Sequence, residues 1–191
     1  MIKKEGNFKW IEKGNGGHKV ILLHGLMGSA ENFGDMVDFI SKECHVYGLD
    51  LKLFEGNILK VSVKNLSDYL YKFMKRIGIE KAVLIGNSMG GHIALIFAKN
   101  HPEMVKGLVL TGSSGLFENS MGDSFPRRGD YDYIKKKTEE VFYDPKTATK
   151  ELVDNVFELA QKRITTLKLI GYAKSAIRHN MGKDIPNIHH P

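Results

Sequence analysis

Residues 83–94, VLIGNSMGGHIA, constrain the fold of this chain more than any other segment. A short apolar run of strand length leads into the pattern Gly-x-Ser-x-Gly, and a helical pattern follows it. A serine at such a strand–helix turn is exposed at the edge of a sheet, and the tight backbone needs flanking glycines. A helix that opens at Ser88 leaves the Met89 N–H without an intrahelical acceptor. The segment therefore predicts a serine hydroxyl beside a free backbone donor.

A second apolar run, residues 20–23, ends in the loop His24-Gly25-Leu26-Met27-Gly28. A His-Gly loop after an early strand, followed later by a Gly-x-Ser-x-Gly turn, resembles the α/β-hydrolase family. The resemblance covers residues 20 to about 115. The Asn before Ser88 and the Gly-Gly after it are similar to the branch that contains the meta-cleavage carbon–carbon bond hydrolases and related esterases.

This resemblance implies roles for several residues. Ser88 would be the nucleophile that forms an acyl-enzyme, and the N–H groups of Leu26 and Met89 would form the oxyanion hole. The alternative for Ser88 is a structural or phosphate-cradling turn, and for the two donors it is lining of the pocket. The residues expected at the substrate site are His24, Gly25 and Ser113. Of these, His24 is expected to shape its loop rather than to titrate in catalysis.

Strand and helix patterns alternate through the first part of the chain. Strands are expected at 7–12, 19–23, 44–49, 81–85 and 107–111, and helices at 29–40, 66–77 and 88–100. Alternation at this spacing predicts an α/β fold, a doubly wound and mostly parallel sheet with right-handed crossovers.

The pattern changes after residue 111, where three helical segments follow without a strand: 130–143, 149–162 and 165–179. In the resembled family, helical insertions of this kind form a lid over the active site. We therefore expect a core at 1–116, a helical lid at 117–182, and a lead-in to a further core strand at 183–191. The lid should pack as a separate layer over the carboxyl edge of the sheet.

A serine hydroxyl needs a base, and the order in the resembled family is serine, acid, histidine. Both partners are expected beyond Pro191, so that the chain as given would be truncated before them and would hydrolyse esters feebly. Asp184 with His189 or His190 is rejected as a local pair, because this segment enters the sheet at the edge opposite to the ligand edge.

The remaining candidate groups have modest expected roles. His92 is expected at the surface or beside the site, His101 as a helix cap, and His179 at the end of a lid helix. Asp50 ends a strand and is either a spare acid or, more simply, a turn residue. The basic residues 127–128 and 135–137 either recognise a carboxylate substrate or form a solvated helix face.

Composition excludes several classes of function. The net charge of +6 arises from dispersed lysines and favours an ordinary surface over a nucleic-acid or membrane partner. The single cysteine, Cys44, cannot form an internal disulfide and indicates a reducing compartment. Residues 1–5 have no apolar leader, and no run is long enough to span a bilayer, so a cytoplasmic location is expected. Motifs for metal, phosphate or dinucleotide binding are not found, and no cofactor is expected.

Together these patterns predict a serine hydrolase that acts on a carboxylic ester or a similar small-molecule acyl substrate. A meta-cleavage-type carbon–carbon bond hydrolase is the alternative within enzymes, and a catalytically silent binding protein is the alternative outside them. An open sheet edge left by truncation would favour self-association.

Overall fold

The computed structural model describes residues 1–116 and 127–191. In these residues, one sheet has the strand order β1-β2-β4-β3-β5-β6. The strands are β1 (Ile2–Glu5), β2 (Phe8–Lys13), β3 (His18–Leu23), β4 (Cys44–Leu49), β5 (Ala82–Asn87) and β6 (Val105–Thr111). Strands β4, β3, β5 and β6 are parallel, whereas β1 and β2 are antiparallel additions at one edge. The expected α/β fold with a mostly parallel sheet is confirmed.

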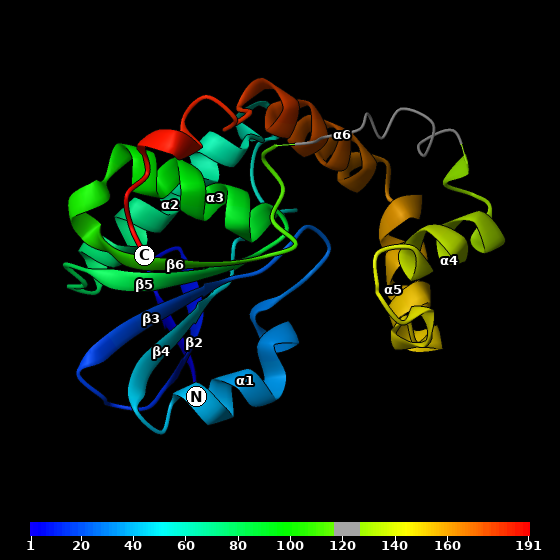
Figure 1. The fold of residues 1–191 in the computed structure, drawn as a ribbon. Coiled ribbons are helices and arrows are strands. Elements are labelled where there is room, and N and C mark those ends of the chain that lie inside the picture. Colours follow the sequence, from blue (N-terminus) through cyan, green and yellow to red (C-terminus); the bar gives the residue numbers. More distant parts are fainter. Residues whose placement is uncertain (117–126) are drawn as a thin grey trace.

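Helices cover both faces of this sheet. Helix α1 (Gly34–Ile40) lies on one face, and α2 (Val63–Arg76) and α3 (Met89–Asn100) lie on the other, as Figure 1 shows. Short 3₁₀ turns connect the elements at Ala30–Phe33, Ile58–Lys60, Pro102–Met104, Pro145–Thr147 and Ile185–Asn187.

Strand β3 is apolar at successive positions because both of its faces are covered. Ile21 and Leu23 belong to the large core under α2 and α3, whereas Val20 and Leu22 belong to the smaller core under α1. Successive strand residues point to opposite faces, so a strand that is covered on both faces needs apolar residues at every position. The run that marks this strand in the sequence is therefore the centre of the fold.

Three further helices follow the sheet: α4 (Tyr131–Glu139), α5 (Lys150–Gln161) and α6 (Arg163–Arg178). The Asp130 carboxylate caps α4 by accepting from the Tyr133 N–H, and the Thr149 hydroxyl caps α5 by accepting from the Leu152 N–H. In Figure 1, α4 and α5 lie together beyond the amino-terminal end of α6, to one side of the sheet. The division into a core, a lid and a lead-in stays a prediction.

Helix α6 is fastened to the core along one face. Tyr172 donates its hydroxyl hydrogen to the Leu53 carbonyl at 3.1 Å, and the Val63 N–H at the start of α2 donates to the Ser175 hydroxyl at 3.0 Å. Lys168, on the same face, is 2% exposed. Residues at this spacing of three and four share one face of a helix. One face of α6 therefore packs on the core, whereas α4 and α5 lie to one side of the sheet (Figure 1).

The last residues lie beside the open edge of β6. The Pro191 carbonyl accepts from the Leu108 N–H at 2.8 Å, and the His190 ring lies 2.9 Å from the Pro102 carbonyl, just before β6 begins. The last residues therefore lie along the amino-terminal half of β6; the lead-in to a further strand stays a prediction. Further along this edge, Val109 and Leu110 are exposed. No helix in the described ranges is both long and apolar enough to cross a bilayer.

Candidate active site

The turn between β5 and α3, which we call the elbow, holds Ser88 in an unusual backbone conformation. Its φ is 52° and its ψ is −119°, a region that costs a non-glycine residue about 1–3 kcal/mol. Four backbone hydrogen bonds hold it there. The Ser88 N–H donates to the Thr111 carbonyl at 3.0 Å, and the Ser88 carbonyl accepts from the N–H groups of Gly91, His92 and Ser114 at 3.0, 3.3 and 3.1 Å. The strained turn directs the Ser88 side chain out of the strand, and the residue is half-buried.

Gly90 is required because α3 begins directly against the end of β3. A Cβ atom at this position would lie 1.9 Å from the Leu23 carbonyl oxygen, far inside any permitted contact. A Cβ at Gly91 would lie 2.4 Å from the Ser113 hydroxyl oxygen. The two glycines after the serine therefore allow the helix to press on β3 and on the loop after β6.

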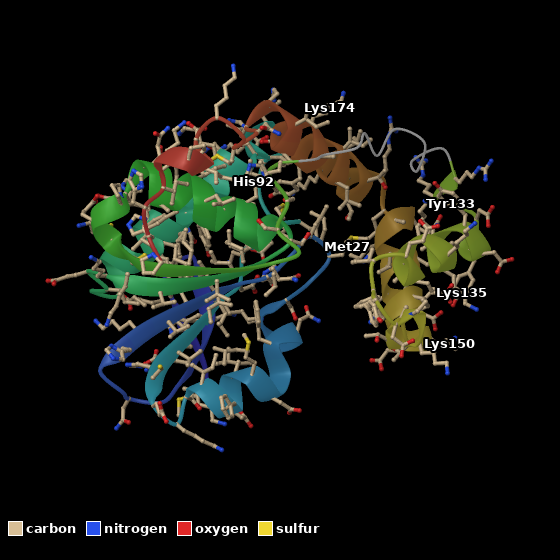
Figure 2. All side chains as sticks on the ribbon, viewed as in Figure 1. Met27, His92, Tyr133, Lys135, Lys150 and Lys174 are labelled. Atoms are coloured by element: carbon tan, nitrogen blue, oxygen red, sulfur yellow. The ribbon has the colours of Figure 1, made fainter. Side chains whose placement is uncertain are left out.

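The loop after β3 reaches the same place. A Cβ atom at Gly25 would lie 3.1 Å from the Cβ of Ser88, so the His-Gly backbone passes close to the serine. The Gly28 N–H donates to the Gly25 carbonyl at 3.1 Å, which closes a tight turn with Met27 at a φ of 68°. Met27 is marked on this loop in Figure 2.

Two backbone donors beside Ser88 have no acceptor among the described residues. Within residues 1–116 and 127–191, neither the Leu26 N–H nor the Met89 N–H donates to a protein atom. Met89 is the first residue of α3, where N–H groups point beyond the helix and lack intrahelical partners. Two such groups near one hydroxyl can hold the negative oxygen of a tetrahedral adduct. Their assignment as an oxyanion hole remains a proposal.

His24 lies inside the protein rather than in an open pocket. It is 3% exposed, its Nδ1 lies 2.9 Å from the Gly25 carbonyl oxygen, and its Nε2 accepts from the Leu51 N–H at 3.1 Å. Burial lowers the pKa of this imidazole below its ordinary value. With both nitrogens occupied, the ring supports the loop, as expected, and has no free nitrogen to offer a substrate.

Ser113 packs on α3, and its hydroxyl donates to the Ser114 carbonyl at 2.9 Å.

The sequence patterns did not identify three residues that support the elbow: Asn87, Thr111 and Ser114. The Asn87 amide donates to both oxygens of Thr111, its carbonyl and its hydroxyl, at 3.2 Å. These residues could have been found from the order of the sheet, because β5 and β6 end side by side at the same edge.

Of the two positions expected for His92, at the surface or beside the site, the surface position is wrong. This residue is completely buried on α3, and its Nε2 lies 2.8 Å from the backbone oxygen of His179, at the end of α6 (Figure 2). His92 lies four residues after Ser88 on an apolar helix, so its ring is enclosed by the residues that pack on that helix. Met181 N–H donates to the Gly115 carbonyl at 2.7 Å beside it, so this region joins the loop after β6 to the end of α6.

No histidine of the described ranges forms a hydrogen bond with the Ser88 hydroxyl. His101 caps α3 and stacks on Tyr71 with ring centroids 4.4 Å apart. His190 contacts Pro102 before β6, whereas Ser88 contacts Thr111 at the opposite end of that strand, about 20 Å away by strand rise. Asp184 pairs with Lys99 at 2.8 Å. The rejection of these groups as a local acid and base agrees with the geometry.

The other charged candidates have structural partners. Asp50 accepts from the Lys52 N–H at 3.0 Å, as a turn-forming residue does. Lys135 pairs with Glu139 and Lys137 pairs with Glu140 along α4, which favours the solvated-face interpretation of this basic stretch. In the described part of the chain, no cluster of three or more His, Cys, Asp or Glu side chains could hold a metal ion.

Comparison with known families agrees with this geometry. The family model for the alpha/beta hydrolase fold matches residues 19–142, which include both the His-Gly loop and the serine elbow. The chain belongs to the alpha/beta hydrolase fold family. The matched range contains strands β4, β5 and β6 and the turn that holds Ser88.

Relatives in this hydrolase family differ in their named activities. A monoacylglycerol lipase from Xenopus laevis is 30% identical over 125 residues, 58% of this chain and 36% of that protein. A 2-hydroxy-6-oxononadienedioate/2-hydroxy-6-oxononatrienedioate hydrolase from Pseudomonas sp. is 30% identical over 176 residues, 83% of this chain and 62% of that protein. The chain thus spans between about a third and three-fifths of the length of these curated relatives.

Solved structures extend the similarity to the whole chain. An alpha/beta hydrolase enzyme from a lagoon-sediment metagenome of Mar Chica, Morocco, is 38% identical, with a TM-score of 0.79, and is matched over 100% of this chain and 72% of its own. A meta-cleavage product hydrolase, CumD, has the same TM-score of 0.79 at 22% identity, which supports the fold alone.

Proposed function

We propose that this chain carries the nucleophile and the oxyanion hole of a serine hydrolase that cleaves a carboxylic ester through an acyl-enzyme on Ser88. The observation that carries the proposal is the strained elbow, which holds Ser88 between the loop of Leu26 and the first residue of α3, Met89. A backbone strained in this way is retained only where the surrounding structure enforces it, and such positions cluster at active sites.

The proposed reaction uses these groups in sequence. The Ser88 oxygen attacks the carbonyl carbon of the ester, and the carbonyl oxygen becomes an anion that accepts from the Leu26 and Met89 N–H groups. The alkoxide then leaves, taking the proton that a general base removed from Ser88, and water hydrolyses the acyl-enzyme by the same route. Loss of one oxyanion-hole donor in a serine hydrolase reduces kcat about 10²–10³-fold, so the two backbone groups are worth as much as a side chain. The location of the acid and the base beyond Pro191 stays a prediction.

A carbon–carbon bond hydrolase of the meta-cleavage type is the second candidate. The observation in its favour is that the Pseudomonas relative named for such a substrate aligns with 83% of this chain, whereas the lipase relative aligns with 58%. A catalytically silent binding protein remains the alternative outside enzymes. The small-molecule acyl substrate, self-association through the β6 edge and the cytoplasmic location all stay predictions.

Turnover separates these candidates. We would measure hydrolysis of p-nitrophenyl acetate and butyrate, and cleavage of a 2-hydroxy-6-oxo-dienoate, by the protein as expressed from its gene. The matched variants are Ser88→Ala and Ser41→Ala, since Ser41 follows α1 just before the amino end of β4, at the sheet edge opposite to Ser88. Ester hydrolysis that is lost only in Ser88→Ala supports the proposal. Cleavage confined to the dienoate favours the carbon–carbon hydrolase, and rates equal in Ser88→Ala would refute a serine mechanism.

A further inference from the structure

We propose that His24 is a positioning residue for the oxyanion hole: its neutral ring fixes the Gly25–Leu26 peptide so that the Leu26 N–H faces the carbonyl oxygen of the substrate. The inference rests on the proposed function and adds a side chain to an oxyanion hole whose donors are both backbone N–H groups. It follows from the contacts of His24 on both sides of the ring.

The orientation of one peptide unit determines where Leu26 donates. In a planar trans peptide the C=O and the N–H point in opposite directions. The Gly25 carbonyl is held on one side by the Gly28 N–H at 3.1 Å and by His24 Nδ1 at 2.9 Å. The Leu26 N–H of the same unit therefore points away from both donors, and in the described structure it meets no protein acceptor. Contacts that fix the direction of the Gly25 carbonyl therefore also fix the direction of the Leu26 N–H.

The contact with Leu51 decides which ring nitrogen carries the proton. Its backbone N–H donates to His24 Nε2 at 3.1 Å, so Nε2 must present a lone pair. The proton of the neutral ring then lies on Nδ1, where it can be donated to the Gly25 carbonyl. Burial also favours the neutral ring, while Asp50 and Glu31 act in the opposite direction through their charges. One tautomer thus satisfies both contacts.

The two donors to Gly25 have different anchors. Gly28 belongs to the same turn as Gly25 and moves with it, whereas His24 is tied to the segment after β4 through Leu51. The imidazole consequently joins the ends of two neighbouring parallel strands, β3 and β4. A turn that closes only on itself can tilt as a unit, but a turn fixed to the next strand cannot. Precise placement of a donor matters, because a displacement of about 1 Å at a reacting centre can cost 10²-fold in rate.

Three substitutions at His24 separate the two contacts. The amide of His24→Asn lies near the position of Nδ1 and can donate to Gly25, whereas that of His24→Gln lies near Nε2 and can accept from Leu51. His24→Leu keeps bulk and removes both contacts. We expect kcat for ester hydrolysis to fall in His24→Leu by between about 10-fold and the 10²–10³-fold that a missing donor costs, with KM nearly unchanged. His24→Asn should recover more of kcat than His24→Gln does.

A purely structural role would give another pattern. If kcat falls equally in the Asn and Gln variants, in proportion to their lost thermal stability, or if only KM changes, the positioning role is wrong. Ser88→Ala is measured in parallel. If ester hydrolysis survives this substitution, the proposed function is refuted, and the role of His24 is then judged by a second measurement. That measurement is the ¹⁵N spectrum of the His24 ring at neutral pH. A protonated Nδ1 and an unprotonated Nε2 support the inference, and the opposite tautomer or a doubly protonated ring overturns it whatever the activity.

Discussion

The ammonium nitrogen of Lys168 lies 2.8 Å from the backbone oxygen of Phe54, and the oxygens of Glu55 and Gly56 lie at 2.9 and 2.8 Å. A lysine has three N–H donors, so each is used by one carbonyl of the loop after β4. No carboxylate contacts this buried cation in the described residues. The contact fixes α6, and through it α4 and α5, to the carboxyl end of the sheet.

Replacement of Lys168 by Met should lower the free energy of unfolding by about 1–3 kcal/mol, because the loop carbonyls lose their donors while the apolar stem is kept. Urea denaturation measures this change. Lys174→Met is the matched control, since Lys174 lies on the same helix and points into solvent (Figure 2), and should change stability by less than about 0.5 kcal/mol. Equal effects of the two substitutions would show that the carbonyl contacts contribute nothing.

Gly90→Ala should destabilise the fold by about 1–3 kcal/mol or more, because the added methyl group meets the Leu23 carbonyl and α3 must move away from β3. Thermal unfolding followed by circular dichroism tests this. Gly17→Ala is the control: nothing lies within 4 Å of a Cβ there. If both variants melt at the same temperature as the parent, the close contact of α3 with β3 is wrong.

The buried ring of His24 predicts a pH dependence of stability. Its pKa in the folded state is lowered from the ordinary value of 6.5, so the unfolded chain binds a proton there more readily than the native protein does. The contribution of the neutral His24 ring to the free energy of unfolding is complete above pH 6.5. It is lost as the pH falls from there toward the folded-state pKa. Unfolding free energies between pH 8 and pH 5 should therefore decline less steeply in His24→Gln than in the parent. If the free energy of unfolding declines with equal slope in the parent and in His24→Gln, His24 does not have a lowered pKa in the folded protein.

The elbow could be predicted because its information is local. A strand, a Gly-x-Ser-x-Gly turn and a helix occupy twelve consecutive residues, and the clash that requires Gly90 involves the neighbouring strand that the second motif already marks. The apolar stripes of α2 and α5 gave their positions for the same reason.

Other features depend on contacts distant in sequence. Strand β1, IKKE, is fully exposed and charged, and exists only because it pairs with β2. The expected strand at 7–12 was found as β2, but its partner was missed. Lys168 resembles any solvated helix lysine until a loop 112–114 residues earlier supplies its carbonyls. The surface alternative for His92 failed because the helix around it is buried on all sides. Periodicity does not report such partners.

The central claim is that Ser88 is the nucleophile, and covalent labelling tests it most directly. The protein as expressed from its gene is treated with a fluorophosphonate, and the modified peptide is located by mass spectrometry after proteolysis. We expect one phosphonyl group on the peptide that contains Ser88, and labelling that disappears in Ser88→Ala but persists in Ser41→Ala, at the opposite edge of the sheet. Labelling of equal extent in Ser88→Ala, or a phosphonyl group on another residue, would contradict it.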